Sequence, residues 1–131
     1  VAMVADSLGF AVDEITETIE PVVAAERVQT EFLTVEPGQA AGVHQIARGT
    51  SQGKELVFLE LRMYVGAKDP ADTIELTGHP SVRLVIPGGA HGDLATAAVV
   101  VNTIPAILDA PAGLRTSRDL PIGFFPPTAK P

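Results

Sequence analysis

Residues 41–65 read Ala-Gly-Val-His-Gln-Ile-Ala-Arg-Gly-Thr-Ser-Gln-Gly-Lys-Glu-Leu-Val-Phe-Leu-Glu-Leu-Arg-Met-Tyr-Val and carry the clearest pattern in the chain. Two apolar segments, 41–50 and 55–65, flank a short polar connection at 51–54 that has a glycine at its bend. Two strands joined by so short a loop run antiparallel and form a hairpin. The stretch therefore predicts a pair of long antiparallel strands.

The second strand of this hairpin alternates between two kinds of side chain. One face is apolar throughout: Val57, Leu59, Leu61, Met63 and Val65. The other face mixes apolar, aromatic and charged groups: Leu56, Phe58, Glu60, Arg62 and Tyr64. Because side chains alternate across a strand, one face packs on the core, and the mixed face is free to meet a partner or a ligand.

The remaining elements follow outward from the hairpin. Short strands are predicted at 13–22, 30–35, 73–77 and 82–86, each bounded by turn residues. For 13–22 a helix competes with the strand, because Ile15 and Ile19 are four residues apart. Eleven of the fifteen residues at 94–108 are apolar, which predicts a buried helix with Pro105 as a kink or an end.

Strands joined in sequence by short turns cannot be parallel, because a parallel crossover needs about a dozen residues. We therefore expect an α+β fold: a mainly antiparallel sheet of five to six strands with helices packed on one face. A chain of 131 residues corresponds to a single domain over 1–131. After residue 109 we expect an irregular tail, with Pro126 and Pro127 near its frayed end.

Composition narrows the possible functions. The chain has no cysteine, which excludes disulfides, thiolate metal sites and a cysteine nucleophile. Its net charge of −7 argues against nucleic acid as a partner. No unbroken apolar run reaches the roughly 18 to 20 residues of a membrane span, and no signal peptide is visible, so we expect no membrane contact and a cytoplasmic location.

The first residues predict a helix over 1–8 that stops at Gly9. No capping residue precedes its apolar stripe, and no initiator methionine is present. We therefore expect that the chain is part of a longer protein, the alternative being a short trimmed tail.

The most suggestive local chemistry lies at 87–96, where a strand runs into Gly88 and Gly89 and then directly into a helix. Glycines let a bound group approach the backbone, and a helix start offers free N–H groups and a positive dipole end. The alternative is a plain strand-to-helix turn with Asp93 as N-cap. A neutral His91 at this corner could exchange a hydrogen bond with a substrate, and Thr96 and Thr103 either bond to their own helix or face a cavity.

Other motifs are rejected. The segment 49–54 has the wrong glycine spacing for a phosphate loop and lacks the hydroxyl after Lys54, so Gly53 is read as a hairpin glycine. The glycines at 88–92 do not form a dinucleotide fingerprint. Three histidines far apart in sequence predict no metal site, and no serine nucleophile elbow occurs.

Over residues 1–121 the chain resembles the C-terminal part of the 2,4-diaminopentanoate dehydrogenases, the native amine dehydrogenases and other dihydrodipicolinate-reductase-like proteins. The resemblance is strongest in Ile-Pro-Gly-Gly-Ala-His-Gly-Asp-Leu-Ala-Thr at 86–96 and in Val-Asn-Thr-Ile-Pro at 101–105. The other similar stretches are 1–9, 18–22, 35–39, 42–49, 61–67 and 118–121.

The resemblance implies NAD(P)-dependent oxidative deamination of an amine, or reductive amination of a ketone, by a parent protein with an N-terminal Rossmann domain. That cofactor half and its acidic catalytic residue have no counterpart here, so no catalytic residue is assigned and the fragment is expected to bind no dinucleotide and to be inactive. The His-His and lysine substrate motif of true dihydrodipicolinate reductases also has no counterpart, so lysine biosynthesis is not implied.

Within the parent this domain is expected to have two roles. It would form a wall of the pocket for a small amine or ketone, with Gly88, Gly89, His91, Asp93 and Thr96 as substrate-binding residues. It would also form a homodimer through the mixed sheet face around Phe58, Arg62 and Tyr64.

Two alternatives remain. One is a stand-alone, non-catalytic binding or assembly module. A start codon just before Val1 would support this module, whereas roughly 200 upstream residues with a dinucleotide fingerprint would support the dehydrogenase. The other is a cofactor-free isomerase or lyase that uses His91 and Asp93, which requires both side chains to converge on a cavity.

Overall fold

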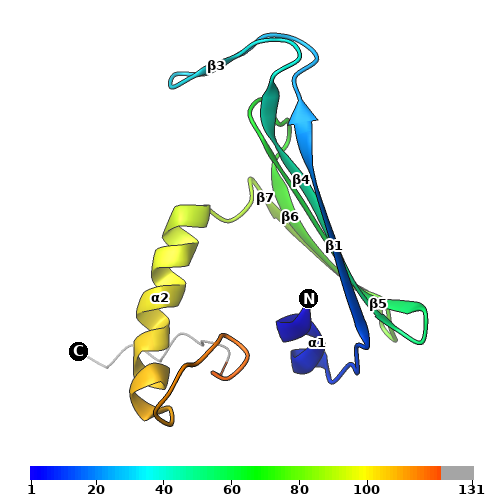
Figure 1. Cartoon of the computed structure of the whole chain (residues 1–131), viewed down its shortest axis with the longest axis vertical. Coiled ribbons are helices and arrows are strands. Elements are labelled where there is room, and N and C mark those ends of the chain that lie inside the picture. The colour runs from blue at the N-terminus through cyan, green and yellow to red at the C-terminus, as the bar shows by residue number, and fades with distance from the viewer. Residues whose placement is uncertain (122–131) are drawn as a thin grey trace. The chain divides into compact units, whose positions relative to one another are not determined.

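The computed structural model describes residues 1–121 in two compact units, Val1–Lys68 and a second unit from residue 69 onward (Figure 1). The first unit contains the helix α1 (Ala2–Leu8) and five strands: β1 (Glu14–Val23), β2 (Val28–Gln29), β3 (Thr34–Val35), β4 (Ala40–Ser51) and β5 (Lys54–Tyr64). The second unit contains β6 (Ala71–Leu76), β7 (Val82–Pro87) and α2 (Gly92–Asp109). Each unit is described by itself.

The first unit is built on a three-stranded antiparallel sheet in the order β1-β4-β5. The β4–β5 hairpin has the predicted glycine bend, and its register pairs Ser51 with Lys54 and Gly42 with Tyr64. On the other side of β4, β1 pairs along its whole length, so the strand prediction for 13–22 is confirmed over the helix. Between β1 and β4, the strands β2 and β3, each of two residues, form a small hairpin, whereas one strand at 30–35 was predicted.

The buried core of the first unit is small. Ala24, Val35 and Ala41 cluster where the β2–β3 hairpin returns to the sheet, with Val65 packed against them. Further along, Val57 is buried on β5 and Ala5 on α1. The predicted helix at the N-terminus forms, and the C-cap residue that follows it, Gly9, adopts the left-handed conformation with φ of 70°.

The apolar face of β5 is the one that α1 approaches. One hollow of about 320 Å³ on this side is lined by Val1, Ala47, Leu59 and Leu61 together with Glu17, Gln45 and Glu60. Val65, at one end of this face, packs against the Ala24, Val35 and Ala41 cluster, whereas Leu61 and Met63 are 46% and 62% exposed. Within the first unit, the face expected to be core is therefore only partly covered.

The second unit begins with the predicted hairpin of β6 and β7, which pair antiparallel from Ala71 with Pro87 to Leu76 with Val82. A loop with a cis peptide bond between His79 and Pro80 connects the two strands. All strand pairs of the described residues are antiparallel, as predicted, but they form seven strands in three separate sheets where five to six strands in one sheet were expected. Short turns fix the direction of neighbouring strands, but they do not fix which hairpins share a sheet.

The helix α2 differs from its prediction. It continues through Pro105 to Asp109, and none of its residues is buried, although its sequence predicted a buried helix. An apolar sequence predicts that a helix has a partner, and in the described part of the second unit the β6–β7 hairpin is the only other regular element.

By length and composition alone, α2 is also long and apolar enough to cross a membrane, the one such helix in residues 1–121. This corrects the expectation that no segment reaches that length. Asn102 and Thr103 interrupt the apolar run, but the mean hydropathy of the whole helix is high despite its polar residues. Core helices of soluble proteins satisfy the same criterion.

After α2 the chain is irregular, in agreement with the predicted tail. Asp119 Oδ2 accepts hydrogen bonds from the Thr116 backbone N–H at 2.8 Å and from its hydroxyl at 2.7 Å, which lower the pKa of this carboxyl. The predicted frayed end at Pro126 and Pro127 lies outside the described residues.

Candidate functional site

The strand-to-helix corner at 87–96 is the candidate site, and it is formed entirely within the second unit. β7 ends at Pro87, and Gly88 and Gly89 then turn the chain with φ of 82° and 70°. These positive φ values are costly for residues with a Cβ atom, which explains the glycine pair. The Gly88 N–H donates to the Pro70 carbonyl at 2.7 Å, so the turn is anchored to the start of β6.

Asp72 organises this corner, and sequence reasoning missed it. The register of the hairpin places Asp72 opposite Ile86. Its Oδ2 accepts a hydrogen bond from the Ala90 backbone N–H at 2.8 Å, and its carboxyl group lies beside Gly89. The signal was available, because pairing 73–77 with 82–86 as a hairpin brings residue 72 next to the glycine turn.

We expect Asp72→Ala to loosen the corner while the rest of the β6–β7 hairpin is retained. The Ala90 N–H loses its acceptor, at a cost of about 1 kcal/mol for one hydrogen bond. Amide hydrogen exchange at Ala90 will therefore be faster than in the original chain. Asp72→Asn keeps a carbonyl oxygen at the same position and serves as the control. Equal exchange rates for Ala90 in all three proteins would show that Asp72 does not hold the corner.

His91, and not Asp93, is the N-cap of α2. Its Nδ1 accepts the Leu94 backbone N–H at 3.5 Å, a long and weak bond. In the neutral ring the proton then belongs to Nε2, which is the nitrogen available to a ligand. Asp93 lies in the first turn, where its negative charge is favoured by the helix dipole. The helix starts at Gly92, so Asp93 is already inside it and cannot be the N-cap.

The corner brings four of the five predicted substrate-binding residues close together in sequence and space: Gly88, Gly89, His91 and Asp93. The fifth, Thr96, lies about one turn further into α2 and is exposed. Gly89 is half-buried, whereas Gly88, His91 and Asp93 are exposed. The corner is thus an open surface with free donor and acceptor atoms. In residues 1–121, no group of three or more histidines and carboxylates could hold a metal ion.

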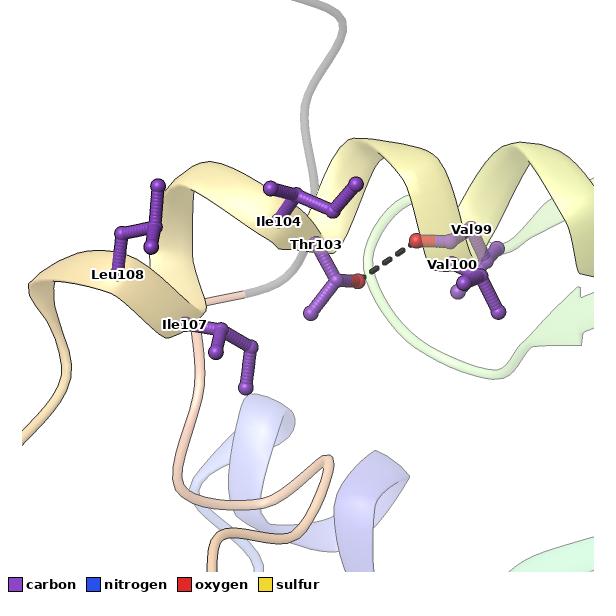
Figure 2. Close-up of a pocket in the computed structure, with 6 residues that line it drawn as sticks. All are labelled: Val99, Val100, Thr103, Ile104, Ile107 and Leu108. Atoms are coloured by element: carbon purple, nitrogen blue, oxygen red, sulfur yellow. Dashed lines mark hydrogen bonds between the residues drawn. The ribbon is translucent and has the colours of Figure 1, made fainter. Parts of the chain in front are cut away.

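A groove of about 370 Å³ follows α2 beyond this corner (Figure 2). Its lining is almost entirely aliphatic: Val99, Val100, Thr103, Ile104, Ile107 and Leu108. The Thr103 hydroxyl donates to the Val99 carbonyl at 2.7 Å, so this residue bonds to its own helix, one of the two alternatives considered. The groove therefore offers hydrocarbon contacts.

The predicted interface residues Phe58, Arg62 and Tyr64 lie in the first unit, on one face of β5, as their spacing predicted. On the same face, Glu60 Oε1 accepts hydrogen bonds from His44 Nε2 at 2.7 Å and from Arg62 Nε at 2.9 Å. These two bonds, the one from His44 first, lower the pKa of the Glu60 carboxyl. The Arg48 guanidinium lies 4.7 Å from the Phe58 ring centre and pairs with Glu55.

The lowered pKa of Glu60 predicts how the stability of the first unit depends on pH. A carboxyl whose pKa is lower in the folded state stabilises the fold above its unfolded pKa, and this contribution is lost as pH falls through the folded pKa. The urea midpoint of the first unit will therefore fall on acidification below the ordinary glutamate range. Glu60→Gln will show a shallower fall, and identical slopes for the two proteins would contradict the assignment.

Comparison with known proteins gives matches along nearly the whole chain. Residues 1–125 match the family model described as the 2,4-diaminopentanoate dehydrogenase C-terminal domain. The chain is 26% identical over 127 residues to the 2,4-diaminopentanoate dehydrogenase of Acetoanaerobium sticklandii, covering 93% of this chain and 36% of that protein. The fold is similar to that of an amine dehydrogenase from Mycobacterium smegmatis, with a TM-score of 0.72 and 24% identity, covering 92% of this chain and 37% of the other. The chain thus spans little more than a third of the length of these relatives.

Proposed function

Because the chain belongs to the 2,4-diaminopentanoate dehydrogenase C-terminal domain family, we propose that it is the substrate-binding and oligomerisation domain of an NAD(P)-dependent amine or diamine dehydrogenase. The family match over residues 1–125 is the observation that carries this proposal. The parent protein would oxidise a small amine with release of ammonia, or aminate the corresponding ketone. A stand-alone binding module is the alternative, and it lacks an observation of its own.

The dinucleotide supplies hydride transfer in this class of reaction, and the described residues do not fit it. A Rossmann site needs a parallel strand–helix–strand unit with a glycine-rich turn, whereas all strand pairs of residues 1–121 are antiparallel. At the glycine corner, the carboxyl group of Asp72 already accepts the Ala90 N–H, and this negative charge disfavours a phosphate. We therefore place the cofactor on a separate N-terminal domain of the parent.

The same corner is better suited to a small amine or its ketone. The negative charges of the Asp72 and Asp93 carboxylates attract a cationic ammonium group from solution to the glycine corner. His91 Nε2–H is placed to donate a hydrogen bond to a ketone oxygen or to the lone pair of a neutral amine. The aliphatic groove of α2 offers contacts to the alkyl chain of such a substrate.

The proposal is tested with the complete gene product that contains these residues. It should reduce NAD⁺ or NADP⁺ when short-chain amines or diamines are added, followed by nicotinamide absorbance, and the reverse reaction should need both a ketone and ammonia. The 131-residue chain serves as the matched control and should show neither activity nor dinucleotide binding. A complete product that binds no dinucleotide would refute the dehydrogenase and favour the stand-alone module.

A further inference from the structure

The outer edge of β5 is open within the first unit, where β4 is its one hydrogen-bonded strand neighbour. The Val65 N–H donates to the Ala41 carbonyl, at the start of β4, at 3.0 Å. Backbone groups alternate in direction along a strand, so those of Leu61 and Met63 also point toward β4. The backbone groups that point outward are those of Phe58, Glu60, Arg62 and Tyr64. This edge offers a row of donors and acceptors to another strand.

The opposite edge of the sheet is protected in a way that β5 is not. β1 carries Glu14, Glu17 and Glu20 and contains Pro21. Like charges and a proline both oppose the addition of a strand at an edge. β5 contains no proline, and it carries charges of both signs in the middle of a mostly apolar sequence. Strand addition is therefore directed to the β5 edge.

The sequence of β5 is complementary to itself. Residues 58–64 read Phe-Leu-Glu-Leu-Arg-Met-Tyr. Suppose that two copies run antiparallel about a twofold axis at Leu61. Each residue of one copy then lies opposite the residue of the other copy whose number, added to its own, gives 122. The pairs are Phe58 with Tyr64, Leu59 with Met63, Glu60 with Arg62, and Leu61 with itself. Aromatic, aliphatic and opposite-charge pairs are those that stabilise adjacent antiparallel strands.

The side chains and the backbone agree on this register. Leu61 has its backbone groups toward β4, so it forms the non-hydrogen-bonded pair at the axis, while Glu60 and Arg62 form the hydrogen-bonded pairs on either side. Within one chain, His44 and Arg62 both bind Oε1 of Glu60. Within residues 1–121, Oε2 of Glu60 has no hydrogen bond and can accept one from the partner's Arg62.

We propose that two copies of this chain pair edge to edge through β5, in the register centred on Leu61, to form one continuous six-stranded antiparallel sheet. The inference rests on the proposed function in taking a second subunit as the partner. It goes further in naming the edge, the register and the symmetry of the contact. In this dimer, Phe58, Arg62 and Tyr64 contact the β5 strand of the other copy across the sheet edge, and the two sheets do not pack face to face.

The register can be tested by disulfide cross-linking, because the chain contains no cysteine of its own. In a non-hydrogen-bonded pair the two Cα atoms lie about 4.5 Å apart, which a disulfide can bridge. Leu61→Cys in the 131-residue chain should therefore form a covalent dimer under mild oxidation, seen as doubled mass on non-reducing gels.

Matched variants separate this register from chance collision. Leu59→Cys alone and Met63→Cys alone place the two copies of each thiol four residues apart along the strands, roughly 13 Å. Each should stay monomeric on the gel, whereas an equimolar mixture of the two should cross-link. Ile19→Cys, exposed on β1, should not cross-link with itself.

A charge exchange provides a second measurement that introduces no thiol. Arg62→Glu places like charges opposite each other and should shift the chain to a monomer in light scattering. Combining it with Glu60→Arg restores opposite charges in the same register and should restore the dimer.

The possible outcomes are distinct. The proposal is supported if Leu61→Cys cross-links, the mixture of Leu59→Cys and Met63→Cys cross-links, and Ile19→Cys does not. A dimer by light scattering in which Leu61→Cys does not cross-link overturns the edge pairing, while the homodimer of the proposed function stands. A monomer at all concentrations overturns both. None of these results affects the test of amine oxidation.

Discussion

Gly42→Ala will lower the free energy of unfolding of the first unit by about 2–3 kcal/mol, near the upper end of the range for overpacking. A Cβ atom at this position would collide with the Met63 carbonyl oxygen and would lie 2.5 Å from Tyr64 Cα. Both obstacles are backbone atoms of β5, directly across from Gly42 in the register. The two strands must separate there, next to the cluster of Ala24, Val35 and Ala41.

Gly49→Ala on the same strand is the matched control. Its Cβ would lie 2.7 Å from Val1 Cγ1, the tip of a side chain that can move aside. We expect a loss of about 1 kcal/mol or less, since the atoms that have to shift, those of Val1 and of Val12 at 3.4 Å, belong to side chains and not to a strand backbone. Urea unfolding of the three proteins, with the m-value checked for each, measures the difference. Equal losses at the two glycines would show that the close approach of β4 and β5 is not a stability determinant.

The parts of the fold that the sequence predicted are those set by local chemistry. The β4–β5 hairpin follows from a glycine bend between two apolar segments, and the stop of α1 follows from Gly9. The pairing of β1 with β4 could not be predicted in this way. It joins strands separated by the β2–β3 hairpin, and the energy that selects it comes from cross-strand contacts between distant residues.

The candidate site was predicted at its glycines and less accurately at its polar groups. The glycine pair Gly88 and Gly89 predicts a turn with positive φ before a helix, and the structure contains that turn. The N-cap was placed two residues late, because aspartate is the stronger capping residue and histidine an uncommon one. Asp72 was missed because its role depends on the register of the β6–β7 hairpin and not on any nearby motif.

The exposure of α2, which was predicted to be buried, shows a different limit of sequence reasoning. Its composition predicts apolar contacts on nearly every side, yet none of its residues is buried in the described structure. A hydropathy pattern indicates that a helix will be covered, but it does not say by which segment or by which protein.

His91→Ala in the complete gene product should lower kcat/KM for the amine by about 10- to 100-fold, the value of one hydrogen bond to a reacting or charged group. The affinity for the dinucleotide should not change, because the corner does not fit that ligand. His91→Asn is the informative companion. Its side-chain oxygen can still accept the Leu94 N–H as an N-cap, so α2 is preserved while the imidazole is lost.

Our main proposal is that the corner at 87–96 contacts the amine substrate of the parent dehydrogenase. Its most direct test is the steady-state kcat/KM of the complete gene product and its His91→Asn variant, with unfolding midpoints measured in parallel. We expect a tenfold or greater loss of kcat/KM at unchanged stability. An unchanged kcat/KM in the folded variant would contradict it.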